Sequence, residues 1–269
     1  RRQMSSAVEV TGVGRRFGTG AHEVIALEDV DLTVAPGEFV SLIGPSGCGK
    51  STLLRLIADL DSPTSGTVSV FGKSAAQARR EHDYGIAFQQ AGLLSWRTVE
   101  ANVALPLEVH GVAKSTRRQR VAELIELVGL TDFAQKYPDQ LSGGMQQRVA
   151  IARALAESPR LLLMDEPFGA LDEITRERMQ TELVRLAEES GAAVVFVTHS
   201  IPEAVFCSDR VVVMSPRPGR IVDVVTTGPG PGAPRNEEYR DADIFTHAVS
   251  RIRHLLHGGV PAPAGREDR

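Results

Sequence analysis

Residues 44–51, with the sequence GPSGCGKS, match the phosphate-loop pattern G-x-x-x-x-G-K-[ST] at every fixed position. Glycines let the backbone curl so that successive N–H groups face one concavity, and a helix beginning directly after the loop adds unpaired N–H donors. Lys50 supplies a cation for the β- and γ-phosphates, and the Ser51 hydroxyl is suited to Mg²⁺. The segment therefore predicts a triphosphate site, for which the alternative is a glycine-rich turn that binds nothing.

Two acids follow the apolar run 161–164, namely Asp165 and Glu166. An apolar strand that delivers acids at its C-terminal end is the expected partner of a phosphate loop. We expect Asp165 to hold Mg²⁺, mainly through water, and Glu166 to orient or deprotonate the attacking water. A solvated acid pair is the alternative, but carboxylates next to a buried strand are costly without a partner.

Three further side chains could reach the same site. Gln89 follows the short apolar strand 84–88, at the strand end where α/β sheets bind ligands, and could reach Mg²⁺ or the attacking water. His199 follows the strand Ala193–Val197 and suits a γ-phosphate. Phe17 could stack on an adenine ring. The alternatives are a solvated glutamine, a structural histidine and a core phenylalanine.

The segment LSGGMQQR, residues 141–148, predicts a second helix start. Ser142 is a favourable N-cap residue, and Gly143 and Gly144 precede a helix that runs through Leu155. The exposed backbone donors make this a second possible phosphate site. One phosphate loop and two such helix starts suggest that another copy of the chain supplies the second.

The elements that must position these side chains alternate between strands and helices. The loop lies between the apolar strand Phe39–Ile43 and a helix that contains Leu53, Leu54 and Ile57. Further strands are expected at Val8–Phe17, Val24–Val34, 67–71, 84–88, 161–164, Ala193–Val197, Arg210–Met214 and 220–225. Helices are expected at 98–110, around 121–128, at Glu173–Ser190 and at 237–257.

Composition narrows the classes of function. The 269 residues are 42% hydrophobic and 24% charged, which is ordinary for a globular protein. A net charge of −4 gives no argument for nucleic-acid binding. No apolar run approaches the ~20 residues that span a bilayer, and residues 1–6 are polar where a leader would be apolar. Cys48 and Cys207 form no disulfide framework, which fits a reducing cytoplasm, and the loop position of Cys48 favours a reactive thiolate.

Taken together, GPSGCGKS, Gln89, LSGGMQQR, LLLMDEP, FGALD and His199 have the order and spacing of ATP-binding cassette (ABC) ATPase subunits, which this chain therefore resembles. The resemblance covers residues 8–226, and phosphate-loop kinases and small GTPases lack LSGGM followed by LLLMDEP. The segments FQQAGLLSWRTV, PFGALDEITR and SPRPGRI resemble importers of the nitrate/sulfonate/taurine type, in which the ATPase is a separate subunit.

The resemblance implies an α/β fold. The expected parts are a phosphate-loop (P-loop) NTPase core with a mixed sheet and an antiparallel β subdomain, and an inserted α-helical subdomain that carries the signature motif. The expected boundaries are 1–88 and 156–230 for the core, 89–155 for the helical subdomain, and 231–269 for a C-terminal helix and a disordered tail.

It also implies ATP and Mg²⁺ as cofactors. The implied catalytic residues are the base Glu166, the switch histidine His199, Gln89 and Lys50, and Asp172 belongs to a loop that crosses a dimer interface. The implied metal ligands are Ser51, Gln89 and Asp165. The implied nucleotide contacts are Phe17, Gly44, Ser46, Gly47, Gly49, Lys50, Ser51 and Thr52, with Ser142, Gly143, Gly144 and Asp172 reaching ATP held by the partner chain.

The function implied is that of an ATP-hydrolysing importer subunit, peripheral on the cytoplasmic face of the membrane. Its partners would be a second copy, integral membrane permease subunits and, indirectly, a solute-binding protein, but no nucleic acid. Cassette ATPases that act on DNA or ribosomes usually carry coiled-coil insertions or two cassettes, and neither is present here. A regulatory module without turnover is a further alternative, against which Lys50, Glu166 and His199 argue.

Two positions depart from the family pattern. Asp59 stands where glycine is usual, and Ser95 stands where proline usually precedes Trp96. Neither departure touches the chemistry. Trp96 suits a protein contact on an exposed loop, and core packing is the alternative because tryptophan is buried on average.

Overall fold

The computed structural model describes residues 6–229 and 233–258. The start of the chain and the tail from residue 259, for which disorder is expected, lie outside these ranges. Within them, no helix combines the length and the apolar character that crossing a bilayer requires.

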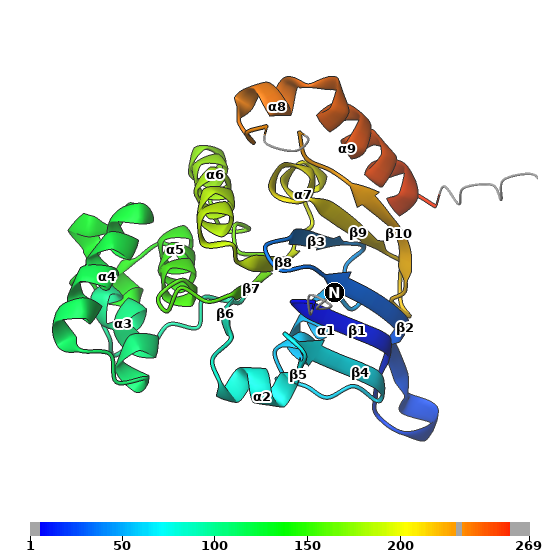
Figure 1. The fold of residues 1–269 in the computed structure, drawn as a ribbon, viewed down its shortest axis with the longest axis horizontal. Coiled ribbons are helices and arrows are strands. Elements are labelled where there is room, and N and C mark those ends of the chain that lie inside the picture. Colours follow the sequence, from blue (N-terminus) through cyan, green and yellow to red (C-terminus); the bar gives the residue numbers. More distant parts are fainter. Residues whose placement is uncertain (1–5, 230–232, 259–269) are drawn as a thin grey trace, which may run out of the picture.

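The larger sheet has the strand order β10-β9-β3-β8-β7-β6 (Figure 1). Its inner strands run parallel, and β10 pairs antiparallel with β9 at one edge. The strands are β3 (Phe39–Ile43), β6 (Tyr84–Ala87), β7 (Leu161–Asp165), β8 (Ala193–Val197), β9 (Arg210–Met214) and β10 (Ile221–Thr226).

Both faces of this sheet are covered. Phe39 and Ile43 of β3 face one apolar core, whereas Val40 and Leu42 face another. Every residue of β3, β7 and β8 is therefore buried, which is why these strands are continuous apolar runs in the sequence. The parallel order also brings the C-terminal ends of the strands to one edge, where ligands bind in such sheets.

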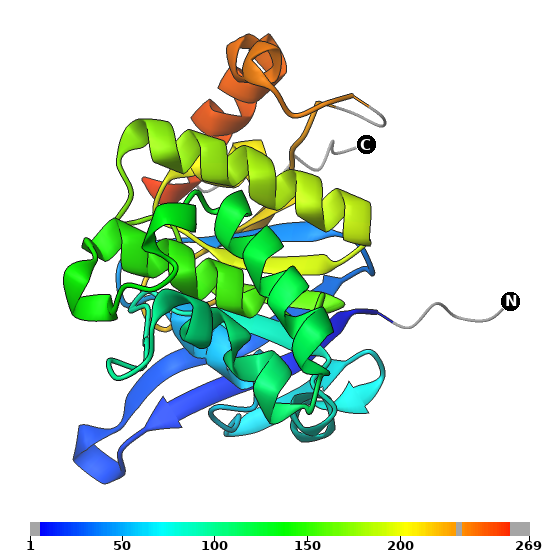
Figure 2. The same ribbon diagram turned by 90° about the vertical axis from the view of Figure 1, so that its left-hand side faces the viewer.

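The antiparallel sheet has the strand order β2-β1-β4-β5. It consists of β1 (Val8–Phe17), β2 (Val24–Val34), β4 (Ser65–Val70) and β5 (Lys73–Ser74). The β1–β2 hairpin, with the 3-10 turn Gly20–His22 at its tip, extends beyond the rest of the sheet (Figure 2). Apolar residues of this sheet and of α1 (Lys50–Ile57) share one core, so the hairpin is fixed relative to the phosphate loop.

The helices form two groups. The first group surrounds the sheets and comprises α1, α2 (Ala75–Arg80), α6 (Glu173–Ser190), α7 (Ile201–Cys207), α8 (Glu237–Asp241) and α9 (Asp243–Leu256). The second group, which we call the helical subdomain, projects to one side beyond β6 (Figure 1). It comprises α3 (Val99–Val109), α4 (Lys114–Leu127), α5 (Gly143–Ala154) and the 3-10 turns Thr131–Phe133 and Pro138–Gln140.

This arrangement confirms the predicted fold class of a P-loop core with an antiparallel β subdomain and an inserted helical subdomain. The helical subdomain shares the apolar core on one face of the larger sheet, where Val103 and Leu124 join Phe168 and Phe196. Within it, the loop residue Trp96 is exposed, so the alternative of core packing is wrong.

The C-terminal helix differs from the expectation. A single helix over 237–257 is predicted, but the backbone of Ala242 is extended and separates α8 from α9. The break lets Tyr239 and Phe245 meet edge to face, with ring centroids 5.3 Å apart. The Tyr239 hydroxyl also donates to the carbonyl of Val205 on α7. Packing on α7 therefore overrides helix continuity here.

Candidate nucleotide-binding site

The phosphate loop connects β3 to α1, and its glycines are needed for space as well as for conformation. Gly49 has φ 99°, and a Cβ there would lie 2.5 Å from Leu27 Cδ2. The buried Lys50 opens α1, and its Nζ donates to the carbonyls of Gly44 (2.8 Å) and Pro45 (3.1 Å). The ammonium group is thus held across the loop, where it can meet phosphate oxygens.

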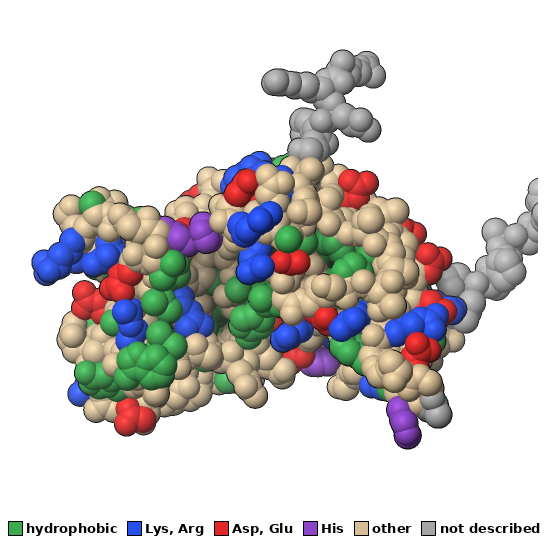
Figure 3. Space-filling view, turned by 90° about the horizontal axis from the view of Figure 1, so that it is seen from below, with side chains coloured by type: hydrophobic (Ala, Val, Ile, Leu, Met, Phe, Trp, Pro, Cys, Tyr) green, Lys and Arg blue, Asp and Glu red, His purple; other side chains and the backbone are tan. Residues whose placement is uncertain are grey.

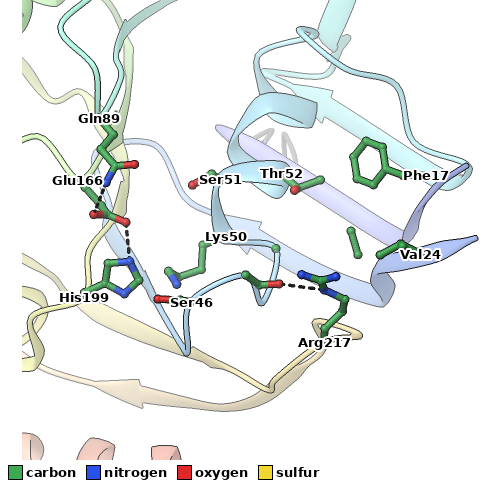
Figure 4. A pocket seen from close by; sticks show the side chains of 13 residues that line it. Phe17, Val24, Ser46, Lys50, Ser51, Thr52, Gln89, Glu166, His199 and Arg217 are labelled. Atoms are coloured by element: carbon green, nitrogen blue, oxygen red, sulfur yellow. Dashed lines mark hydrogen bonds and ion pairs between the residues drawn. The ribbon is translucent and has the colours of Figure 1, made fainter. Parts of the chain in front are cut away.

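A cavity of about 490 Å³ opens over this loop. Its volume lies in the range of cavities that hold nucleotide-sized ligands. Residues from both sheets and from several strand ends converge on it (Figure 4). Its walls consist of Phe17, Val24, Ala26, Ser46, Gly47, Gly49, Lys50, Ser51, Thr52, Gln89, Glu166, His199 and Arg217.

Glu166 stands at the centre of one end of the cavity (Figure 4). It follows β7, and its backbone N–H donates to the carbonyl of Val197 on β8 (2.9 Å). Its Oε1 lies 2.6 Å from His199 Nε2, and its Oε2 accepts from Gln89 Nε2 at 3.1 Å. The three side chains therefore come from the ends of β6, β7 and β8 and form one hydrogen-bonded group.

The residues expected to hold Mg²⁺ lie beside this group. The Ser51 hydroxyl donates to Asp165 Oδ1 (2.9 Å), and burial raises the pKa of Asp165. Gln89 directs its amide nitrogen to Glu166, which leaves the amide oxygen on the side of Ser51 (Figure 4). Within the described ranges, no group of three or more His, Cys, Asp or Glu could hold a metal alone. A site with only a few protein oxygen atoms beside a phosphate loop is typical of Mg²⁺, because this ion takes its remaining ligands from phosphates and water.

The opposite end of the cavity carries the aromatic residue. Phe17 ends β1 and is 40% exposed, next to Val24 and Ala26 of β2. The guanidinium of Arg15 lies 4.4 Å from the centroid of the Phe17 ring and pairs with Asp61. Because Arg15 supports the ring, Phe17 offers a fixed apolar face to a base. The alternative of a core phenylalanine does not hold.

Comparison with known proteins bears on this geometry. The sequence model of the family described as "ABC transporter" matches residues 27–169. The nitrate import ATP-binding protein NrtD of Synechocystis sp. is 43% identical over 256 residues, covering 93% of this chain and 95% of that protein. The taurine import ATP-binding protein TauB of Rhizobium johnstonii is 49% identical over 247 residues, covering 90% and 92%.

Solved structures of ABC transporter cassettes have the same fold as this chain. The dimeric structure of MJ0796, a bacterial ABC transporter cassette, superposes with a TM-score of 0.77 at 37% identity and covers 83% of this chain and 100% of that chain. A dimeric post-hydrolysis state of MJ0796 with ADP and Pi gives 0.76 at 38% identity, with the same coverage. This chain belongs to the ABC transporter family. It is an ABC-type ATPase that binds ATP.

The signature residues of this cassette lie outside the cavity. Ser142 caps α5, where its Oγ accepts from the N–H of Met145, and Asp172 caps α6. The hydrogen bond from the Thr175 N–H lowers the pKa of Asp172. A Cβ on Gly144 would lie 2.9 Å from the carbonyl oxygen of Ala170, so the start of α5 and the FGALD loop are in close contact.

Gly143 differs from its neighbour in the signature. A Cβ added there would meet no atom within 4 Å. The first turn of α5 is therefore open on this side, where a partner could approach its backbone.

Most predicted site residues meet in one place. Gly44 holds Lys50 through its carbonyl, and Asp165 reaches the cavity through Ser51. The predicted residues that do not line the cavity are these two, which lie behind its wall, and Ser142, Gly143, Gly144 and Asp172.

Sequence reasoning missed four residues at the site, namely Arg15, Val24, Ala26 and Arg217. Of these, only Arg217 had a signal, because it lies in the Pro/Gly-rich turn SPRPGRI. The others lie on strands whose pattern predicts a sheet but no contact with a ligand.

Cys48, for which a reactive thiolate is expected, lies on the buried side of the loop. Cys48 is fully buried, and its Sγ lies against Gly44, where an added Cβ would be 2.7 Å away. The Lys50 ammonium is 3.7 Å from the sulfur, but burial keeps reagents out. Cys48 therefore packs the inner side of the loop, and alkylation is expected to require opening of the loop.

Proposed function

We propose that this chain is the ATP-hydrolysing subunit of an ABC importer, acting as a homodimer on membrane permease subunits at the cytoplasmic face. The relatives named for nitrate import and taurine import support this direction of transport. In such an assembly the chain would be peripheral, and a solute-binding protein would act through the permease.

The observation that carries the proposal is the hydrogen-bonded group of Glu166, His199 and Gln89 beside Lys50. The loop amides and Lys50 bind and orient the triphosphate. Glu166 accepts the proton of the attacking water, and His199 holds the carboxylate in place until a γ-phosphate replaces that contact. Ser51, Asp165 and Gln89 would hold Mg²⁺, which would neutralise phosphate charge.

The placement of the signature residues supports a homodimer. Ser142, Gly143 and Gly144 lie at a helix start whose N–H groups favour phosphate, yet they do not face the cavity of their own chain. A second copy placed head to tail would bring its α5 start and its Asp172 loop over the cavity. MJ0796, 37% identical to this chain, is dimeric.

The solute class we propose is a small oxyanion of the nitrate, sulfonate or taurine type. Its support is the identity of 43% and 49% to the nitrate import and taurine import relatives over nine-tenths of the chain. The solute itself would contact the binding protein and the permease.

Phosphate release from ATP by the purified chain tests the hydrolysis step. We expect release that requires Mg²⁺, stops with a chelator and returns when Mg²⁺ is restored, because Mg²⁺ would neutralise triphosphate charge that the Lys50 ammonium alone leaves uncompensated. A chain that binds ATP but releases no phosphate, alone and with its membrane subunits, would instead be a regulatory module.

The solute class is tested with the assembled transporter in lipid discs. Nitrate, taurine and an alkanesulfonate are added one at a time in the presence of the binding protein. We expect one of them to raise the ATPase rate. Stimulation by an uncharged or cationic solute alone would reject the oxyanion class while leaving the ATPase assignment intact.

A further inference from the structure

The turn between β9 and β10, at the β10 edge of the larger sheet, places Arg217 at the cavity. Residues 215–220 form this turn, and Arg217 is its contribution to the cavity wall. The proposed chemistry of hydrolysis does not use this arginine, which lies far along the chain from the phosphate loop.

The turn is fixed against β2 and the loop. The N–H of Gly219 donates to the carbonyl of Ala26 (2.9 Å), and the N–H of Glu28 donates to the carbonyl of Gly219 (3.0 Å). A Cβ on Gly219 would lie 1.9 Å from the carbonyl oxygen of Cys48, so only glycine fits between the turn and the loop. Arg217 is therefore carried on a rigid support at a set distance from the loop.

The Arg217 guanidinium makes one long hydrogen bond and no ion pair among the described residues. Its Nε donates to the Gly47 carbonyl at 3.4 Å, at the long limit of a hydrogen bond. Across residues 6–229 and 233–258, no carboxylate lies within ion-pair distance of it. Its neighbour Arg220, by contrast, pairs with Glu28. An exposed guanidinium without a carboxylate partner is available to a ligand.

The position of Arg217 along the cavity indicates which part of the ligand it meets. Figure 4 shows Arg217 with Phe17 and Val24 at one end, whereas Glu166 and His199 lie at the other. The γ-phosphate belongs at the Glu166 end and the base at the Phe17 end. A planar guanidinium stacks on aromatic rings, and every nucleobase offers such a face.

We propose that Arg217 is a base-binding residue, with the adenine ring held between the Phe17 ring and the Arg217 guanidinium. Arg15 already covers Phe17 from outside the cavity, so the stack would run Arg15, Phe17, adenine, Arg217. This inference rests on the proposed nucleotide function and adds the second wall of its base subsite. Arg217, the first arginine of the SPRPGRI segment, would thereby contribute to the affinity for the nucleotide.

The test separates a base contact from a phosphate contact. Calorimetric titration of the full chain with MgADP is compared with titration with magnesium triphosphate, which has no base. For Arg217→Ala we expect MgADP to bind about three- to thirtyfold more weakly, the range of a cation–π contact, and triphosphate to bind within about twofold of wild type. Arg217→Lys keeps the charge but not the plane and should restore only part of the affinity.

The matched control is Arg220→Ala, which removes a cation of the same turn that faces Glu28 instead of the cavity. It should bind MgADP as wild type does. The proposal is overturned if Arg217→Ala retains MgADP affinity, if triphosphate affinity falls by the same factor, or if Arg220→Ala loses as much as Arg217→Ala. A wild-type chain that binds no MgADP would overturn the nucleotide function itself, and the base contact with it.

Discussion

Glu166 has an uncommon backbone conformation, with φ at 48°, at the point where β7 ends. A left-handed conformation in a residue other than glycine costs on the order of 1–3 kcal/mol, so surrounding contacts must outweigh it. The hydrogen bond to Val197 fixes the backbone, and His199 and Gln89 fix the carboxylate. The conformation turns the carboxylate into the cavity, where a general base is needed.

Replacing Glu166, the proposed base, by an amide of the same shape tests its role. Glu166→Gln retains the side-chain volume but removes the proton acceptor, so we expect phosphate release to fall by about 10²–10⁴. Nucleotide binding should survive because Lys50, Ser51 and the loop amides are untouched. Single-turnover phosphate release and MgADP titration measure the two effects. The exposed Glu173→Gln is the control, and turnover at the wild-type rate in Glu166→Gln would remove this residue from the base role.

Some site residues could be predicted from the sequence and others could not. The phosphate loop, Glu166 and His199 follow from local patterns, since a strand end or a helix start fixes where they point. Arg217 depends instead on a turn that docks on β2, and the guanidinium of Arg15 is held by Asp61, 46 residues further along the chain. Such contacts between distant segments leave no periodic trace in the sequence.

At the scale of elements, a buried polar chain links the helices to the catalytic loop. Glu203 of α7 accepts hydrogen bonds from Gln180 of α6 and from the Thr198 hydroxyl, next to His199. Gln180 in turn accepts from Arg240 of α8 (2.8 Å). Burial raises the pKa of Glu203, against the effect of these hydrogen bonds. Gln180 and Glu203 therefore connect Arg240 of α8 to Thr198, the residue that precedes His199.

This raised pKa predicts how stability depends on pH. Because its pKa is raised, Glu203 binds more protons in the folded state than in the unfolded state. The contribution of this carboxyl to the free energy of unfolding therefore falls as the pH rises above 4.5, the ordinary pKa of a glutamate. In Glu203→Gln the charge is lost, the amide oxygen still accepts from Gln180, and the amide nitrogen would donate to the Thr198 hydroxyl instead of accepting from it. We therefore expect the variant to gain stability over wild type as pH rises from about 5 to 8, by about 1.4 kcal/mol for each unit of pKa elevation.

Urea unfolding at several pH values measures this difference between variant and wild type. Glu177→Gln, at an exposed position of α6, serves as the control and should show no trend with pH. A stability difference for Glu203→Gln that stays constant across the range, or that shrinks toward high pH, would contradict the assigned burial cost.

Element bounds were predictable where a pattern is local. Val8–Phe17, Val24–Val34 and Glu173–Ser190 coincide with β1, β2 and α6 because apolar alternation and the Asp172 cap fix them. The break at Ala242 was not predictable, since it follows from packing on α7.

Asp59 shows why its position usually holds glycine in the family. It follows the end of α1 with φ at 52°, a conformation that glycine adopts without strain. Its carboxylate pairs with Arg79 of α2, so the aspartate gains a contact that glycine could not make.

At the scale of the whole molecule, the helical subdomain presents apolar side chains to solvent. Figure 3 shows hydrophobic side chains gathered on this lobe when the molecule is seen from below. Its exposed large apolar residues include Trp96, Val109, Phe133 and Tyr137. Exposed aromatic residues of this kind favour a protein partner, and the proposed function provides one in the membrane subunits.

Trp96 is 72% exposed and tests this surface. Since its side chain packs little within the chain, Trp96→Ala should leave the thermal unfolding temperature unchanged. Assembly with the membrane subunits should weaken by about tenfold or more, as for a central aromatic anchor. Affinity in detergent and thermal unfolding are the two measurements, with Val222→Ala, at an exposed position of β10 outside the helical subdomain, as the control. A fall in unfolding temperature without a loss of affinity would place Trp96 in the support of the subdomain instead.

Closure of two cassettes over ATP is the behaviour that the proposed homodimer predicts. In Glu166→Gln, ATP persists, and removal of a carboxylate beside the triphosphate relieves like-charge repulsion. We therefore expect this variant to become dimeric in ATP and Mg²⁺, whereas wild type dimerises only transiently. Adding Ser142→Arg should abolish the dimer, because the signature would then clash with the partner's nucleotide. Light scattering after a sizing column decides between these states. Loss of turnover without dimerisation would leave Glu166 as the base and show that closure needs the membrane subunits.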